Sequence, residues 1–510
     1  MRGRVVGVLC LFLLAAAPVQ VGATNGELPL GRPGLPETRT TTQLAPGVTY
    51  TRIERGFRSN DDFYTVDVAF VESESEAEQI AADLEASGYD ARTAAIERAP
   101  DDPRPGPSGY VVRSGRFTTQ QEADARRAEL VARAYSSART VYTAQTGDPT
   151  AGPFVVHVLE ILPDVFEGTV EAELATEIVP EREKLTDMAR RTGALAGINA
   201  GYFVIDEQDG TPGDLAGISV IDGDLVSEAV NGRTSLIVRP HDGASVATLD
   251  SNISVTVARR KFLVDGLNRE PGEIRSCGGV GGDIPTQDPK HDFTCTDPSE
   301  LIVFTESFGA TTEAGPGAEA VVDRTGRVIA VREARGGSIP PEGAVLSATG
   351  EVAADLLRVA QLGDRARVEA DVTEGRRKIA VANGLGIVNG GPLLVEDGSD
   401  HITAFAEGFV WLDDPSFYYR FGIFRHPRTI AGVTADGGLL LVAIDGRQFD
   451  YSVGASFAEE AGVMRALGAV DAVNLDGGGS TTLVIDGELV NRPSDATGER
   501  PIGDALLLFD

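Results

Sequence analysis

Asp476 opens a run of residues that could carry chemistry, within the segment AVNLDGGGSTTLVIDG at residues 472–487. A carboxylate at that position could act as a general acid or base. The glycines that follow let the backbone approach a ligand closely, and successive free N–H groups in such a turn form an anion-binding nest. The hydroxyl groups after them could donate hydrogen bonds to a phosphate or sugar oxygen. The candidate ligand-binding residues of this run are Gly477, Gly478, Gly479, Ser480, Thr481 and Thr482.

The same run departs from two known motifs. No lysine follows the glycines as it would in a P-loop. Ser480 also lacks the G-x-S-x-G frame of a nucleophile elbow. The alternative interpretation is a hairpin turn between two strands, because Asp-Gly is a favoured turn pair. The residues alone leave both interpretations open.

Three further polar stretches are predicted at strand ends: NAGYF at 199–203, NGGP at 389–392 and RHPRT at 425–429. Arginine suits phosphate because its guanidinium forms two parallel hydrogen bonds, although a lone arginine in an acidic protein is more often part of a surface ion pair. From these stretches and the C-terminal segment, Asn199 and Arg428 are candidate catalytic residues together with Asp476. The candidate substrate-binding residues are Tyr202, Asn389, Gly390, Thr429, Arg500 and Asp504.

The elements that must position these residues belong to one large αβ domain, predicted over 150–510. A helix is expected over 181–191 with Gly193 as its stop. Apolar runs predict strands over 194–198, 386–389, 429–434, 439–445, 469–475 and 482–485. A β-rich subdomain is predicted as an insertion over 245–375. The predicted fold class is α+β, with a mixed-sheet domain preceded by a smaller module.

Two cysteines lie in the Gly- and Pro-rich loop at 270–300, Cys277 and Cys295. A disulfide between them is the favoured prediction for an oxidising compartment. A zinc site with His291 is the competing interpretation, but two thiols and one imidazole make a poor structural set. No metal-ligand spacing is visible elsewhere, so a divalent cation among oxygen ligands stays open.

The N-terminus predicts export from the cell. Arg2 and Arg4 precede an apolar run at 5–17, and small residues end at Ala23, which together predict a signal peptide over 1–23. No later run reaches the roughly 18 apolar residues that a membrane span needs. Residues 24–61 are rich in Pro, Gly and Thr and predict a flexible linker. The expected location is secreted, extracellular or associated with the cell wall.

Residues 62–146 repeat a strand–helix–strand pattern twice, which suggests a small ferredoxin-like sheet with helices on one face. Capping boxes are predicted at Ser75/Glu78 and at Thr119/Glu122. The segment YVVRSGRFTTQQEADARRAEL resembles the SPOR module, whose members bind peptidoglycan glycan strands. The resemblance implies peptidoglycan as a partner, and the alternative is a module of this shape that binds another ligand or acts as a spacer.

The four polar stretches together, in this order, resemble the phosphodiester glycosidase family of the uncovering-enzyme type, over about 150–510 and most weakly over the insertion. The chain departs from the family pattern at Ala200 and at Gly503-Asp504. The resemblance implies hydrolysis of a sugar-1-phosphodiester. Arg428, Arg500 and the glycine amides would then stabilise the phosphoryl oxygens, and Asp476 would serve as base or face C1 of the sugar.

Asn199 and Asn389 would bind sugar hydroxyl or acetamido groups in this scheme, and Tyr202 or Phe203 would stack on the ring. Asp504 is the competing acid. The formal net charge of −32 repels the phosphate backbone and argues against nucleic acid as a partner. The leading hypothesis is therefore a secreted glycosidase that cleaves an N-acetylglucosamine-type sugar–phosphate bond in a wall or capsular polymer. The alternative is a non-catalytic protein that binds anionic polysaccharide during export or maturation of surface polymers.

Overall fold

The computed structural model describes residues 26–510 apart from 208–209, 231, 240–242, 276–283 and 286–293. The predicted signal peptide and Cys277 lie outside the described residues. Cys295 is buried and disulfide-bonded, and its pairing with Cys277 stays a prediction. Among the helices of the described ranges, none is long and apolar enough to cross a membrane.

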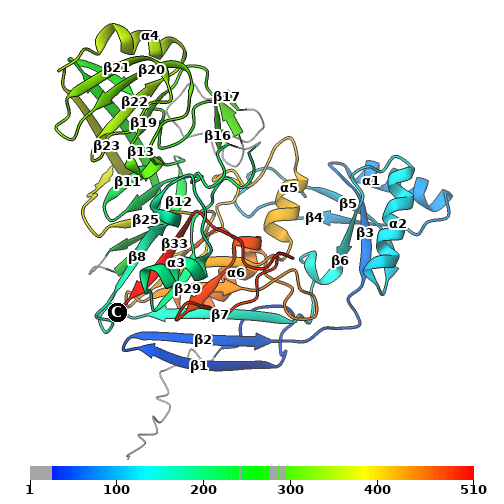
Figure 1. Ribbon diagram of the computed structural model, residues 1–510. Coiled ribbons are helices and arrows are strands. Elements are labelled where there is room, and N and C mark those ends of the chain that lie inside the picture. Colours follow the sequence, from blue (N-terminus) through cyan, green and yellow to red (C-terminus); the bar gives the residue numbers. More distant parts are fainter. Residues whose placement is uncertain (1–25, 208–209, 231, 240–242, 276–283, 286–293) are drawn as a thin grey trace, which may run out of the picture.

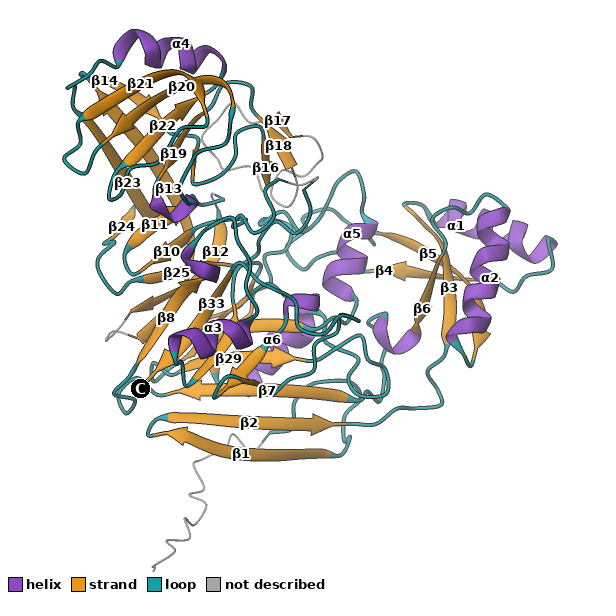
Figure 2. Cartoon of the chain, in the orientation of Figure 1, coloured by secondary structure: helices purple, strands orange, loops and turns teal. Residues whose placement is uncertain are grey.

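The N-terminal module has a four-stranded antiparallel sheet in the order β4-β5-β3-β6, which is the ferredoxin-like order that the repeat predicted (Figure 2). Its elements are β3 (Tyr64–Val71), α1 (Glu74–Ala86), β4 (Arg92–Ile96), β5 (Gly109–Phe117), α2 (Gln120–Ala132) and β6 (Arg139–Tyr142). The capping box at Thr119/Glu122 is confirmed. The first helix is capped by Ser73, not by Ser75, so it begins two residues earlier than predicted.

The prediction of a flexible linker over 24–61 is wrong. Strands β1 (Glu37–Ala45) and β2 (Val48–Arg55) form an antiparallel hairpin, and β2 pairs along its whole length with β7 (Phe154–Ile161). The threonines favour a strand because β-branched side chains fit a pleated surface, and Gly47 supplies a positive φ of 78° at the turn. A segment whose composition is typical of a flexible linker therefore forms a β-hairpin at the edge of the central sheet.

A large antiparallel sheet forms the centre of the second domain, with the strand order β1-β2-β7-β29-β28-β30-β26-β27 (Figure 1). Its remaining strands are β29 (Leu439–Ile444), β28 (Arg428–Thr434), β30 (Ala469–Asn474), β26 (Leu393–Glu396) and β27 (Ser399–Asp400). Helix α6 (Phe457–Ala466) packs on one face of this sheet, and two further sheets cover the other face. Both faces of the central sheet are therefore shielded from water, which explains why its strands have continuous apolar sequences.

The two covering sheets bring distant segments over the central one. The first has the order β32-β31-β9-β33-β8, with strands β32 (Glu488–Leu489), β31 (Leu483–Ile485), β9 (Ala196–Asn199), β33 (Asp504–Phe509) and β8 (Thr169–Leu174). The second contains β11 (Asp224–Ser227), β10 (Ser219–Ile221), β25 (Gly386–Asn389), β12 (Arg233–Arg239), β13 (Gly243–Val257), β23 (Ala366–Glu374), β24 (Arg377–Ile379) and β14 (Arg260–Leu263). Helix α3 (Leu185–Thr192) starts later than predicted and ends at Gly193, whose φ of 75° is left-handed.

A five-stranded subdomain lies between β13 and β23 in the chain, inside the segment predicted as an insertion, and projects from the core (Figure 1). It contains β15 (Gly266–Leu267), β19 (Leu301–Phe304), β22 (Ala344–Ala348), β20 (Gly315–Val322), β21 (Val328–Arg335) and α4 (Gly350–Val359). Beside it lies a small sheet of β16 (Glu273–Arg275), β18 (Thr294–Thr296) and β17 (Ile284–Pro285). The whole chain is thus an α+β protein that is rich in strands.

Candidate active site

The antiparallel order of three central strands creates the site. Strand β28 runs between β29 and β30 and is antiparallel to both, and Arg428 at its start pairs with Ile444 at the end of β29. The start of β28 therefore lies at the same end of the sheet as the residues that follow β29 and β30. Those residues are Arg447 and Asp476. These three segments are far apart in sequence, and the antiparallel pairing of their strands brings them together at this end of the sheet.

The D-G-G-G-S-T run is not a hairpin. It leaves β30 in the central sheet and enters β31 in the first covering sheet, through a 3-10 turn at Gly478–Ser480. Gly478 has a φ of 63°, and a Cβ at Gly479 would lie 2.1 Å from Nη2 of Arg500. The glycines therefore serve a left-handed turn and a close approach to an arginine, and the run forms the floor of a pocket.

The pocket has a volume of about 180 Å³ and gathers residues from three of the four predicted stretches, 199–203, 425–429 and 472–487. One wall is aromatic, and the rest is a ring of cationic groups around a single carboxylate. Its lining residues are Tyr202, Phe421, His426, Arg428, Arg447, Asp476, Gly477, Gly478, Gly479 and Arg500.

Asp476 is the carboxylate of this pocket. Burial raises the pKa of Asp476 to about 6, while the Ser480 hydroxyl, the charges of Arg500 and Arg447 and the Gly477 N–H favour the ionised form. At neutral pH the group is therefore mostly ionised yet close to its pKa. Such a carboxylate can accept a proton from water or face a developing positive charge.

Two of the three arginines are held by carboxylates. Arg428 is almost completely buried, its Nε lies 2.8 Å from Glu460, and its Nη2 donates to the carbonyl of Phe421 at 2.5 Å. Arg500 pairs with Asp495 at 2.8 Å. Burial raises the pKa of Glu460 to about 8, so the Glu460 carboxyl group and two backbone carbonyls hold the Arg428 guanidinium in place while the ionisation of Glu460 is disfavoured.

Arg447 is the third guanidinium and, within the described part of the chain, forms no ion pair. Its Nε lies 3.2 Å from Nδ1 of His426. Burial and the charges of Arg428 and Arg500 lower the pKa of Arg447. The three cations repel one another, so an anion placed between them would relieve that repulsion.

His426 orients Arg447 instead of donating a proton to a ligand. Its Nε2–H donates to the carbonyl of Arg420 at 2.6 Å, which leaves Nδ1 as the acceptor for Arg447. Burial, together with the charges of Arg428 and Arg447, lowers the pKa of His426 well below its ordinary value. The ring is therefore neutral at physiological pH, with its proton on Nε2.

Asn199 does not face the pocket, which corrects the predicted sugar contact and catalytic role. Its side chain is buried, and Nδ2 donates to the backbone carbonyl of Asp476 at 2.7 Å. Its Oδ1 accepts the Thr429 hydroxyl at 2.8 Å and the Thr482 N–H at 3.0 Å. Asn199 connects the end of β9 to the segment that carries Asp476, so its role is to hold that segment in position.

Asn389 has a similar supporting place and is also buried. Its Oδ1 accepts the N–H of Tyr202 at 2.9 Å, and the Tyr202 hydroxyl donates to the carbonyl of Gly391 at 2.9 Å. A Cβ at Gly390 would lie 2.8 Å from the carbonyl of Asn474, so that glycine allows close packing of the backbone. Asn389 thus holds Tyr202, Gly390 allows close packing against the end of β30, and only Tyr202 of these three residues lines the pocket.

Four other predicted ligand-binding residues are fully or almost fully buried behind the lining. The Thr429 hydroxyl donates to Asn199, the Thr481 carbonyl accepts from Asn491, and Ser480 bonds Asp476. Asp504 accepts the N–H of Gly201, and burial raises its pKa to about 7. The four residues, which do not contact the pocket, are Thr429, Ser480, Thr481 and Asp504.

Two of the three glycine N–H groups in the predicted anion nest already have hydrogen-bond acceptors within the protein. The N–H of Gly477 bonds the carboxylate of Asp476, and the N–H of Gly478 donates to the carbonyl of Pro427 at 2.8 Å. Only the N–H of Gly479 lacks an acceptor among the described residues. Anion recognition therefore falls to the guanidinium groups more than to the backbone.

The sequence prediction did not select five residues that build the site: Phe421, His426, Arg447, Glu460 and Asp495. His426 lies inside the stretch RHPRT, two residues before Arg428, and this short distance in sequence could have identified it as a site residue. Arg447 follows a predicted strand that neighbours Arg428 in the sheet, and this end-of-strand position was the available clue.

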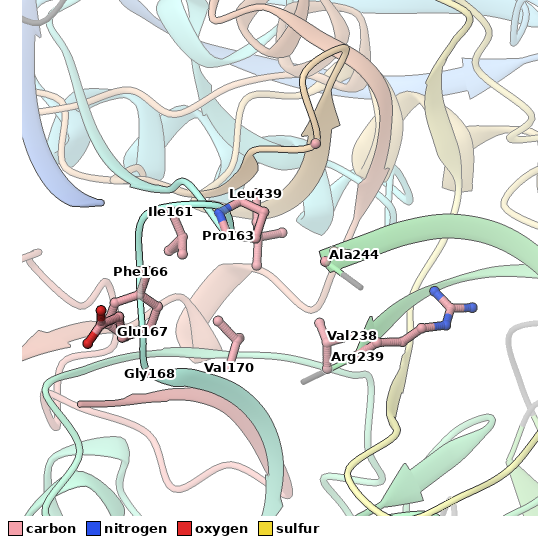
Figure 3. A pocket seen from close by; sticks show the side chains of 12 residues that line it. Ile161, Pro163, Phe166, Glu167, Gly168, Val170, Val238, Arg239, Ala244 and Leu439 are labelled. Atoms are coloured by element: carbon pink, nitrogen blue, oxygen red, sulfur yellow. The ribbon is translucent and has the colours of Figure 1, made fainter. Parts of the chain in front are cut away.

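A separate cavity of about 270 Å³ lies between the central and covering sheets (Figure 3). Its walls are mostly apolar, with Glu167 and Arg239 as the charged members, and no predicted site residue lines it. Within the described residues there is also no group of three or more His, Cys, Asp and Glu side chains that could hold a metal ion.

Family comparisons agree with the two modules. The model described as phosphodiester glycosidase matches residues 316–509, and the SPOR domain model matches residues 60–140. Residues 316–509 therefore match the phosphodiester glycosidase family, and a SPOR domain lies on their N-terminal side.

Three relatives show how far the likeness extends. A solved protein from Burkholderia pseudomallei, named as a proposed exported protein, is 34% identical with a TM-score of 0.85, and the match covers 97% of this chain and 100% of that one. The bovine N-acetylglucosamine-1-phosphodiester alpha-N-acetylglucosaminidase is 29% identical over 174 residues, 27% of this chain. A prophage-derived uncharacterized protein of Bacillus subtilis is 33% identical over 84 residues, 16% of this chain. The matches span 33% and 13% of the length of these two curated relatives.

Proposed function

We propose that the protein hydrolyses a sugar-1-phosphodiester bond in a polymer of the cell envelope. The observation that carries this proposal is the pocket that three arginines line together with Asp476. A phosphodiester brings one negative charge to the pocket, and its leaving phosphate monoester carries a second as the bond to C1 breaks. The cations of Arg428, Arg447 and Arg500 suit that growing charge.

The absence of a proton donor on the pocket lining is consistent with this substrate class, as far as the described residues go. A phosphate monoester is a weak base and departs from C1 with little protonation. His426 holds its Nε2 proton in a bond to the Arg420 carbonyl, so it is not a ready acid. Asp476 has the pKa and position to activate a water molecule or to stabilise an oxocarbenium-like sugar.

The SPOR domain supports a location at the cell wall. Peptidoglycan glycan strands are the proposed partner of this domain, and an N-acetylglucosamine-type phosphodiester in a wall or capsular polymer is the proposed substrate. The bovine relative acts, by its name, on an N-acetylglucosamine-1-phosphodiester, which agrees with this choice of sugar. Export, the signal peptide over 1–23 and the disulfide between Cys277 and Cys295 belong to the same proposal.

The test is release of free N-acetylglucosamine from UDP-N-acetylglucosamine by the full chain. Asp476→Asn should abolish release while the variant stays folded. Asp471→Asn is the matched control, because Asp471 lies on the same strand β30 but outside the pocket. Sugar release by the Asp476 variant at the parent rate would remove this carboxylate from the reaction.

A second outcome separates catalysis from binding. If the parent protein binds sugar phosphates but releases no sugar from any sugar-1-phosphodiester, the pocket belongs to a binding protein for anionic polysaccharide. Calorimetry with N-acetylglucosamine 1-phosphate supplies the binding arm. Retention of the protein on purified peptidoglycan tests the SPOR domain separately.

A further inference from the structure

The wall segment is defined as residues 416–424, and its helix lies between the SPOR sheet and the rest of the second domain (Figures 1 and 2). It comprises α5 (Ser416–Tyr418), the π-helical turn η4 (Tyr419–Ile423) and Phe424. Helices α1 and α2 cover one face of the SPOR sheet. On its other face, Val111 and Val141 form one buried apolar cluster with Tyr419 and Phe424. The second domain therefore covers the face of the SPOR sheet that its own helices leave open.

A buried polar network fixes this contact. The Tyr419 hydroxyl accepts a hydrogen bond from Nη2 of Arg113 at 2.7 Å and donates to Oδ2 of Asp67 at 3.2 Å. Nε of Arg113 also pairs with Oδ1 of Asp67 at 3.0 Å. Their exposed fractions are 0% for Tyr419, 4% for Asp67 and 7% for Arg113.

Such a network favours one docked arrangement. Separating the two domains would expose the ion pair, while any shift that kept it buried would leave a charge or a hydroxyl unpaired at a cost of about 1–3 kcal/mol. A module on a loose tether needs no such network. The SPOR domain is therefore locked to the second domain through Tyr419.

The two residues after Tyr419 build the pocket. The carbonyl of Arg420 accepts the Nε2–H of His426 at 2.6 Å, and the carbonyl of Phe421 accepts Nη2 of Arg428 at 2.5 Å. The Phe421 ring itself lines the pocket. Three consecutive residues thus join the SPOR network on one side to the histidine, the arginine and the aromatic wall on the other.

We propose that Tyr419 is a positioning residue through which the docked SPOR domain sets the geometry of the pocket. The SPOR domain is then a structural part of the active site as well as an anchor. The consequence for activity rests on the proposed function, whereas the consequence for pocket geometry does not. The competing explanation is that the docking only buries apolar surface, in which case losing the Tyr419 hydroxyl changes stability alone.

The test compares Tyr419→Phe with Tyr418→Phe in the full chain. Tyr418 is also buried in the wall segment, but its hydroxyl makes no hydrogen bond with any described residue, so it is the matched control. Both substitutions keep the ring and remove only the oxygen. The first readout is the NMR signals of the His426 ring in protein labelled with nitrogen-15 histidine, identified by their loss in a His426→Asn variant. The second is calorimetric binding of inorganic phosphate.

Tyr419→Phe should shift the His426 ring signals and weaken phosphate binding about five-fold, whereas Tyr418→Phe should change neither. If Tyr419→Phe lowers the melting temperature but leaves the His426 signals and the phosphate affinity equal to those of Tyr418→Phe, the proposal is overturned. Asp67→Asn removes the charge from the same network with little change in shape. It serves as the second variant should Tyr419→Phe fail to fold, with the same expected changes and the same overturning result.

Turnover separates this inference from the proposed function. Changed His426 signals in a protein that never releases sugar would uphold the docking inference and refute the hydrolysis. An active parent whose Tyr419→Phe variant keeps its His426 signals and its kcat/KM would refute the docking inference alone.

Discussion

Asp504 is a buried carboxyl group whose ionisation should cost the folded protein free energy. Its side chain is fully buried, Oδ1 accepts the N–H of Gly201 at 2.7 Å, and Oδ2 has no hydrogen-bond partner among the described residues. Burial raises the pKa of Asp504 to about 7, and the single bond from Gly201 offsets this only in part. The charge of nearby Asp476 contributes to the same rise.

The direction of the pH effect follows from that raised pKa. The unfolded chain loses the Asp504 proton near pH 4, whereas the folded chain keeps it until about pH 7, so stability falls as the pH rises through this window. One pKa unit corresponds to about 1.4 kcal/mol. The cost accumulated between about pH 5 and pH 8 is therefore about 3 kcal/mol.

Asp504→Asn keeps the shape of the side chain and an oxygen for Gly201 but cannot ionise. Relative to the parent, the variant should gain about 3 kcal/mol in its free energy of unfolding between about pH 5 and pH 8. Urea denaturation of both proteins across this range measures the difference. Asp476 and Glu460 titrate in both proteins, so their contributions to the difference in stability largely cancel. Two stability profiles that stay parallel across the range would refute the raised pKa.

Two further outcomes follow from the pocket. Gly479→Ala should push Arg500 out of place, since a Cβ there would lie 2.1 Å from Nη2, and weaken inorganic-phosphate binding about ten-fold by calorimetry. Equal affinity would exclude Arg500 from the phosphate site. If Asp476 acts as a base, kcat/KM should fall below about pH 6, its pKa, and a flat profile down to pH 5 would remove that role.

Strand location was largely predictable, because it depends on local pattern. Strand Gly386–Asn389 agrees with the prediction to the residue, since a short apolar run is bounded by glycines on both sides. The failure over 24–61 has a non-local cause. The partner of β2 is β7, about 100 residues further along the chain, and composition alone does not show whether a Thr-rich segment will find such a partner.

Side-chain direction was not predictable in the same way. Asn199 and Asn389 follow strand patterns and were assigned to the sugar, but both turn inward to hold Asp476 and Tyr202. Which side of a strand end faces a pocket depends on how sheets stack, and that information is spread over the whole chain. Arg447 was missed for the same reason, because its place beside Arg428 comes from the pairing of β28 with β29.

The arginine pocket and the acidic surface act over different ranges. A net charge of −32 repels an anionic polymer at a distance, yet at physiological ionic strength that repulsion is screened beyond about 8 Å. Inside the pocket, where burial limits screening, three guanidinium groups attract a phosphate strongly. Under the proposed function, charge can therefore select the bond to be cleaved, whereas retention of the polymer must come from contacts with its sugar backbone. The SPOR domain, which is docked against the wall segment, is the proposed source of those contacts.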